Sequence, residues 1–191
     1  MSRETALFDR HGNRKYLNGA ERRMFLRAAN EETDPAARAF CLTLFYAGCR
    51  ISEGLNLTAE RVDLRGKALV FETMKRRKLG CFRSVPIPDS LTKLLRSIVA
   101  ERKPAERVWN LSRPTAYRLV KDRMAKAGFT GAMASPKGLR HGFAIACIGP
   151  SVPLTTVQKW LGHARLETTA IYLDASGDEE REFAKRLWAA S

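Results

Sequence analysis

The sequence is poor in residues that build metal sites and disulfide frameworks. Its four cysteines form no C-x-x-C pair, and no histidine stands at metal-ligand spacing from any of them. Cysteines placed in this way are typical of reduced, mostly buried thiols in a cytosolic protein. The cysteine pattern therefore predicts no metal site and no stabilising disulfide.

Long apolar runs are absent as well. No run approaches the ~20 residues that a membrane-spanning helix needs. The first residues, MSRET, lack the apolar core of a secretory signal peptide. We therefore expect a protein that stays in the cytoplasm and has no membrane partner.

Acidic residues are scarce beside the basic ones. The chain has 34 Lys+Arg against 20 Asp+Glu, which gives a formal net charge of +14. Such an excess favours a polyanionic partner, most simply nucleic acid, although a basic but inert surface is the alternative. With 191 residues, of which 45% are hydrophobic, the chain can fill one domain but not two large ones.

The pattern of apolar residues predicts a mainly helical fold of the α+β class, with one small antiparallel β-hairpin. Residues 1–17 are polar and predict a flexible N-terminal arm before a single domain over 18–191. Capping residues, which include Ser52 and Asp89, and amphipathic spacing predict the helices. Their expected ranges are 18–30, 34–47, 52–57, 89–99, 112–127, 135–148, 152–161, 166–173 and 178–189. Strands are predicted at 67–73 and 82–88.

One stretch in the last third of the chain combines cations, histidines and a phenol. Lys137, Arg140 and His141 stand at i, i+3 and i+4 of one predicted helix, so they lie near one face and can converge on one ligand. The planar arginine fork matches two phosphate oxygens. His163 follows a glycine turn, and Tyr172 comes nine residues later. The stretch therefore has groups that can hold a phosphate and attack it.

Arg50 lies far upstream, directly after the predicted helix end at Gly48. A phosphoryl transition state spreads charge over its non-bridging oxygens, and two guanidinium groups can bind both. Each residue taken singly has a structural alternative. An Arg–His pair is usually a surface pair, a lone histidine is often a structural hydrogen bonder, and a lone tyrosine is often part of the core.

Taken together, these segments resemble the tyrosine recombinases, the phage integrase family. The matching segments follow the family's order and span roughly residues 18 to 190. They are AGCRISE at 47–53, a basic hairpin that ends in Val85-Pro86, GLRH at 138–141, WLGH at 160–163 and TTAIY at 168–172. The resemblance implies the fold of a tyrosine recombinase catalytic domain.

The resemblance also implies site-specific recombination of double-stranded DNA. Tyr172 would attack a phosphodiester and form a 3′-phosphotyrosyl link that frees a 5′-hydroxyl. Arg50 and Arg140 would bind the scissile phosphate, and His163 would donate a hydrogen bond to a non-bridging oxygen. No metal or nucleotide cofactor is implied, because the covalent link conserves the bond energy.

A lysine of the hairpin would be the general acid for the leaving 5′-oxygen. Lys78 fits the family pattern best, since a small turn and then Val85-Pro86 follow it, and Lys75 is the rival. Arg76 and Arg77 are poor acids because the pKa of guanidinium is too high. These arginines, with Lys75, are instead expected to bind DNA. Arg118 and Lys121, on the predicted helix at 112–127, are further expected phosphate contacts.

Two supporting residues and one departure from the family pattern complete the expected site. Glu53 would orient Arg50, and His141 would support the site from beside Arg140. The position three before Arg140 is most often histidine in the family, and here it is Lys137. A lysine there is found in some relatives. Lys137 would then be the general base for Tyr172, but a lysine must first be neutral before it can accept a proton.

Two further expectations concern assembly. No helical core-binding domain fits before Arg50, so the chain resembles a catalytic domain alone. In relatives the segment after the nucleophile docks on a neighbouring protomer and links four in a ring. Phe183, Leu187 and Trp188 would be the docking residues here, and packing within the same chain is the alternative.

Two other functions are compatible with the same motifs. One is a non-catalytic DNA-binding accessory protein, which would bind DNA without forming a covalent product. The other is a type IB topoisomerase, which uses a similar set of Arg, Lys, His and Tyr and would relax supercoiled DNA without a specific site.

Overall fold

The computed structural model describes residues 7–73, 80–148, 152–174 and 178–189. The described chain is mostly helical with one small antiparallel sheet, so the predicted fold class is confirmed. In chain order the elements are α1 (Gly19–Asn30), α2 (Pro35–Ala47), α3 (Ile51–Leu55), the 3-10 helix η1 (Ala59–Arg61), β1 (Val62–Asp63), β2 (Ala68–Glu72), β3 (Phe82–Pro86), α4 (Asp89–Val99), α5 (Arg113–Lys126), α6 (Pro136–Ile148), α7 (Leu154–Leu161), α8 (Glu167–Ala170), the 3-10 helix η2 (Ile171–Asp174) and α9 (Asp178–Ala189).

Local capping explains where several helices begin. Asn18 and Glu21 form a capping box at the start of α1, and the Asp34 carboxylate accepts from the Ala36 N–H at the start of α2. Two predicted caps are wrong. The N-cap of α3 is Arg50 rather than Ser52, and the N-cap of α4 is Pro88.

The sheet has the strand order β1–β2–β3, with antiparallel pairing throughout. In the β2–β3 hairpin Val70 lies opposite Ser84 and Leu69 opposite Val85. Strand β1 was not predicted, because two residues are too few to show alternation. The segment that joins β2 to β3 carries Lys75, Arg76, Arg77 and Lys78, and it lies outside the described residues.

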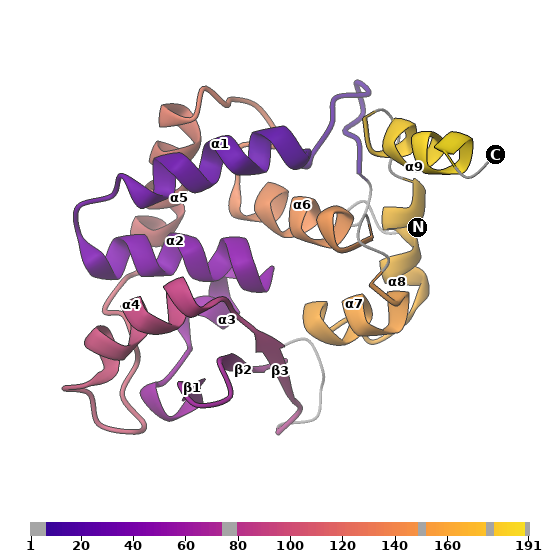
Figure 1. The fold of residues 1–191 in the computed structure, drawn as a ribbon. Helices are drawn as coiled ribbons and strands as arrows, with labels where there is room; N and C mark the ends of the chain where they lie inside the picture. The colour runs from indigo at the N-terminus through magenta and orange to yellow at the C-terminus, as the bar shows by residue number, and fades with distance from the viewer. Residues whose placement is uncertain (1–6, 74–79, 149–151, 175–177, 190–191) are drawn as a thin grey trace.

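Two hydrophobic clusters meet at α6. The larger cluster holds residues of α1, α2, α4, α5 and the sheet, including the fully buried Phe25, Phe40 and Trp109. The smaller one joins the second half of α6 to α7 and η2. Figure 1 shows α6 in the centre, with α1, α2 and α5 on one side and α7, α8 and α9 on the other. Helix α6 therefore lies between the two parts of the molecule.

The segment before α1 is packed in the structure. Tyr16 and Leu17 are fully buried, and Leu7 is 5% exposed. The backbones of Phe8 and Arg14 pair in an isolated antiparallel β-bridge. The prediction of a flexible arm over 1–17 is therefore wrong for residues 7–17. Its tyrosine and leucines were overlooked in a stretch that is otherwise polar.

Gly48 ends α2 in a left-handed conformation, with φ 56°. A Cβ placed there would lie 2.2 Å from Cδ1 of the Phe143 ring on α6. We expect Gly48→Ala to lower the free energy of unfolding by ~2–5 kcal/mol, because left-handed strain adds to overpacking. Urea denaturation measures the loss.

Gly128→Ala is the matched control for this variant. Gly128 also has a positive φ, of 82°, but nothing lies within 4 Å of its built Cβ. Gly128→Ala should therefore lower the free energy of unfolding only by the amount that comes from left-handed backbone strain. Equal losses in the two variants would show that the contact between Gly48 and Phe143 has no role in stability.

Candidate active site

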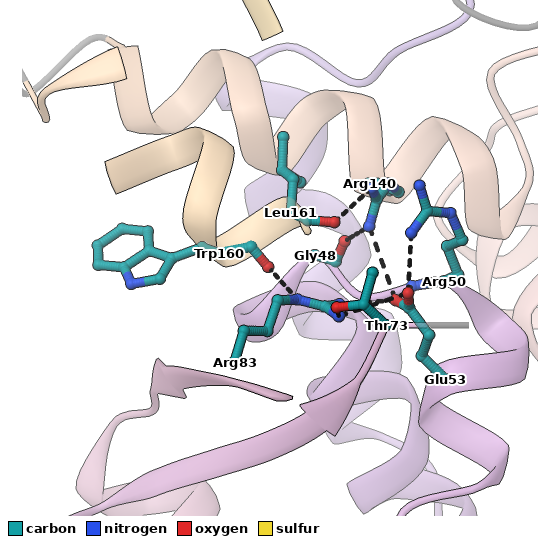
Figure 2. A network of polar contacts seen from close by, with 8 residues as sticks. All are labelled: Gly48, Arg50, Glu53, Thr73, Arg83, Arg140, Trp160 and Leu161. Atoms are coloured by element: carbon teal, nitrogen blue, oxygen red, sulfur yellow. Dashed lines mark hydrogen bonds and ion pairs between the residues drawn. The ribbon is translucent and has the colours of Figure 1, made fainter. Parts of the chain in front are cut away.

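Glu53 is the centre of a buried charge cluster (Figure 2). Its side chain is fully buried and contacts three guanidinium groups. Arg50 donates to Oε1 at 2.8 Å, Arg83 donates to Oε2 at 2.7 Å, and Arg140 lies 3.9 Å from Oε2. Glu53 therefore positions all three arginines, whereas the family resemblance implied only that Glu53 would orient Arg50.

The ionisation of Glu53 depends on those neighbours. Burial raises the pKa of its carboxyl, but attraction to Arg83, Arg140 and Arg50 outweighs burial. The net pKa is below the ordinary value of 4.5. Glu53 is therefore a carboxylate at neutral pH and partly neutralises the cations around it.

Arg140 joins the ends of two helices. Its guanidinium donates to the carbonyl of Gly48, the C-cap of α2, at 2.9 Å and to that of Leu161, the last residue of α7, at 2.7 Å. Carbonyls at a helix C-terminus have no partner within the helix, so a buried cation satisfies them well. Burial, and then repulsion by Arg50, lowers the pKa of Arg140 to about 10, so it stays charged at neutral pH.

A guanidinium has five N–H donors, and these two bonds leave others for a ligand. Arg50 is the more open of the two arginines expected to bind phosphate, since 26% of its side chain is exposed. Arg50 and Arg140 are coupled through Glu53 and repel one another. The structure thus brings together two cations, Arg50 and Arg140, that are more than one helix apart in sequence.

Arg83 belongs to the same cluster and was missed in the sequence. It is 6% exposed, and it donates to Glu53, to the Thr73 hydroxyl at 3.2 Å and to the Trp160 carbonyl at 2.7 Å. The burial of β3 alternates, so Arg83 points inward like Val85. That period of two, counted back from Val85, could have identified it.

His163 lies on the turn after α7, where Gly162 has a φ of 66°. Its Nδ1 is 2.9 Å from the hydroxyl of Thr169, which is fully buried. Burial, and then the charges of Arg140 and Arg50, lowers the pKa of His163 to about 3, so the ring is neutral. If Thr169 donates to Nδ1, the ring proton lies on Nε2, the tautomer that can donate to an oxygen of a ligand.

Tyr172 lies in η2, with 2% of its surface exposed. Its ring stacks on His163, with centroids 6.3 Å apart and an interplanar angle of 12°. Its hydroxyl is 3.0 Å from Nδ1 of His141. Burial raises the pKa of Tyr172, and attraction to Arg140 and Arg50 partly opposes that effect. The phenol therefore lies in the electrostatic field of both arginines.

The remaining predicted cations differ in position. Lys137 is exposed on α6, Arg118 is exposed on α5, and Lys121 is half-buried on the same helix. Arg123 of the same helix is buried and pairs with Glu32 at 3.0 Å. Leu187 and Trp188 of α9 are 68% and 63% exposed, and the Phe183 side chain lies outside the description.

Metal and membrane sites have no support in the described residues. No group of three or more His, Cys, Asp or Glu in the described ranges could hold a metal ion. In the same part of the chain, no helix has the length and apolar character to cross a bilayer.

Comparison with known proteins gives a consistent result. The model of the phage integrase family matches residues 15–179. A tyrosine recombinase of Thermosipho africanus is 30% identical over 177 residues, which cover 90% of this chain and 61% of that protein. Tyrosine recombinase XerA of Pyrococcus furiosus is 30% identical, over 78% of this chain and 54% of its own length. The chain thus spans little more than half the length of these relatives.

Solved structures show the same fold. The crystal structure of XerA recombinase has a TM-score of 0.77 and 25% identity, and the match covers 90% of this chain and 64% of that one. The catalytic domain of bacteriophage HP1 integrase has a TM-score of 0.63 and 22% identity, over 89% of this chain and 93% of that one. A XerH recombinase bound to its difH substrate has a TM-score of 0.73.

Proposed function

Because the chain belongs to the phage integrase family, we propose that it cuts and rejoins DNA as a tyrosine-type site-specific recombinase. One observation carries the proposal. A buried phenol, Tyr172, lies against His163 and in the field of Arg50 and Arg140. Such a group of cations and donors around one nucleophile fits attack on a phosphodiester. We further propose that residues 18–191 form the catalytic domain.

The reaction starts with attack of the Tyr172 oxygen on the phosphorus of a DNA phosphodiester. The new O–P bond forms as the bond from phosphorus to the 5′-oxygen breaks, which leaves a 3′-phosphotyrosyl link and a 5′-hydroxyl. Arg50 and Arg140 hold the non-bridging oxygens, and His163 donates a hydrogen bond to one of them. These groups stabilise charge that grows in the transition state. In rejoining, a 5′-hydroxyl attacks the same phosphorus and releases Tyr172.

The general acid is assigned to the basic segment between β2 and β3. Lys78 would protonate the leaving 5′-oxygen, and Lys75 is the alternative. Arg83 supports this assignment, because it joins β3 to Glu53 and to the end of α7. A general acid must lie within reach of the leaving oxygen, and Arg83 fixes the strand that directly follows the segment with this lysine. Lys75, Arg76, Arg77, Arg118 and Lys121 would bind phosphates along the duplex.

Two further parts of the proposal concern partners and place. The exposed Leu187 and Trp188 would dock, with Phe183, on a neighbouring protomer, so that four protomers assemble on DNA. The XerH neighbour, whose structure contains its difH substrate, supports double-stranded DNA as the partner. The cytoplasm, where bacterial and phage DNA lies, is the proposed site of action.

The test is a nicked suicide substrate that contains the DNA flanking the gene. Cleavage next to the nick releases a short fragment, so rejoining is blocked and the covalent complex accumulates. We expect the wild-type protein to give a product that resists denaturing electrophoresis, and Tyr172→Phe to give none. Salt-dependent binding without this product would instead indicate an accessory protein. Relaxation of any supercoiled plasmid would indicate a topoisomerase.

A further inference from the structure

The hydrogen bond between His141 and Tyr172 brings a ring nitrogen of His141 into direct contact with the oxygen of the proposed nucleophile. Its Nδ1 lies 3.0 Å from the Tyr172 oxygen, both side chains are buried, and the ring centroids are 5.6 Å apart. We propose that His141 is the general base that accepts the proton of Tyr172 as its oxygen attacks phosphorus. This inference rests on the proposed recombinase activity and replaces the supporting role that the sequence suggested.

Other candidate bases of the site are less suited. Lys137 is exposed on α6 and would have to lose its proton first. The Nδ1 of His163 is already bonded to Thr169. The Glu53 carboxylate is engaged by Arg50 and Arg83. A general base must be within hydrogen-bond reach of the proton that it takes, and the geometry of His141 meets that condition.

The charges around His141 keep it neutral. Burial, and then repulsion by Lys137 and Arg140 of α6 and by Lys15 before α1, lowers its pKa to about 3. At neutral pH the ring therefore has a free lone pair. The phenol proton becomes strongly acidic only as the O–P bond forms, so proton transfer accompanies attack. The arriving phosphate adds negative charge beside Arg140, which makes a protonated His141 easier to form.

The surroundings of the second ring nitrogen indicate that the protonated form of His141 is transient. Nε2 of His141 is buried, and no partner for it is found among the described residues. If Nδ1 accepts the proton, Nε2 carries the N–H of the neutral ring. No carboxylate in the described part of the chain bonds that N–H and would hold the imidazolium. Recombination must run in both directions, and such a base returns the proton readily when Tyr172 leaves phosphorus.

Atoms and charges balance in this step. The proton moves from the Tyr172 oxygen to Nδ1 of His141, the O–P bond forms, and the bond from phosphorus to the 5′-oxygen breaks. The 5′-oxygen takes its proton from the hairpin lysine. Rejoining reverses each transfer, and no oxidant, reductant or metal takes part.

The first test compares single-turnover rates of covalent adduct formation on the suicide substrate. We expect His141→Gln to slow the rate by ~10²-fold or more, within the range typical of a lost general base. His11→Gln is the matched control, because His11 is exposed in the N-terminal segment, and it should keep the wild-type rate. A wild-type rate in His141→Gln would overturn the proposal. A faster rate would overturn it too, because the contact would then restrain Tyr172 in the resting protein.

A sulfur leaving group distinguishes a base from an acid. A substrate with sulfur at the bridging 5′ position needs no proton donor, because a thiolate leaves readily. This substrate should restore cleavage in a Lys78→Ala or Lys75→Ala variant, whichever has lost the general acid, but not in His141→Gln. Recovery in His141→Gln would contradict a role in taking the Tyr172 proton.

Two measurements separate chemistry from folding. In His141→Ala, added imidazole should increase the rate in proportion to its free-base concentration, and an unchanged rate would contradict the proposal. In the wild-type protein without DNA, ¹⁵N spectra of labelled histidine should show the proton of His141 on Nε2. A proton on Nδ1 would overturn the proposal even if every variant failed to fold. A wild-type protein that forms no adduct would instead reject the recombinase activity itself.

Discussion

Arg140→Ala should slow formation of the covalent DNA adduct by ~10²–10³-fold, the usual cost of removing one preorganised charge from a transition state. DNA binding should change far less, because many other cations contact the phosphates. A gel-shift titration measures binding, and single-turnover cleavage of the suicide substrate measures the chemical step. Arg140→Lys should restore little activity, because an ammonium cannot reproduce the bonds of the guanidinium fork.

Arg102→Ala is the control for this series. Arg102 lies in the loop after α4 and pairs with the exposed Glu106. Its removal should leave both the rate and the binding unchanged. An Arg140→Ala protein that cleaves within a few-fold of wild type would contradict the assignment of Arg140 to the phosphate. So would a loss that appears only in DNA binding.

Glu53→Ala should have the largest effect on stability. The variant leaves Arg50, Arg83 and Arg140 close together without their shared buried carboxylate. Breaking a buried ion pair from one side typically costs ~3–5 kcal/mol, because a desolvated charge loses its partner. Urea denaturation at neutral pH should show a loss of that size, and adduct formation should fall with it, since Arg50 and Arg140 lose their fixed positions.

The control and the pH dependence sharpen this prediction. Glu106→Ala removes the exposed carboxylate that pairs with Arg102, and it should change stability little.

The folded pKa of Glu53 lies below its ordinary value of 4.5. The stability that Glu53 contributes is therefore complete above that value and is lost as the pH falls through the folded pKa. The difference between wild type and variant should therefore shrink as the pH falls below 4.5 and through the folded pKa of Glu53. A constant difference would contradict the buried carboxylate as its source.

The local elements were predictable because their signals are local. Asn18 and Asp34 mark the starts of α1 and α2 through backbone hydrogen bonds within four residues. Gly48 and Gly162 mark helix ends, since each adopts the left-handed conformation. The motifs around Arg50, Arg140 and Tyr172 identified the family because each is a short run with a fixed chemistry.

The missing parts of the site depend on contacts that are distant in sequence. Arg83 donates to Glu53, which lies 30 residues earlier, and to a carbonyl 77 residues later. His141 reaches Tyr172 across 31 residues, although its position beside Arg140 suggested only a supporting role. The period of two in β3 indicates that Arg83 faces inward but not which residues it contacts, and the contact of His141 with Tyr172 has no periodic signature. A basic sequence does not distinguish an arginine that holds a carboxylate from one that binds a phosphate.

The most direct test is to map the covalent bond itself. After trapping on the suicide substrate, the complex is digested and the peptide that carries the DNA fragment is sequenced by mass spectrometry. We predict one modified residue, Tyr172, joined to a 3′-phosphate, and no adduct in Tyr172→Phe. A link through another residue, a link to a 5′-phosphate, or an adduct that persists in Tyr172→Phe would contradict the proposed mechanism.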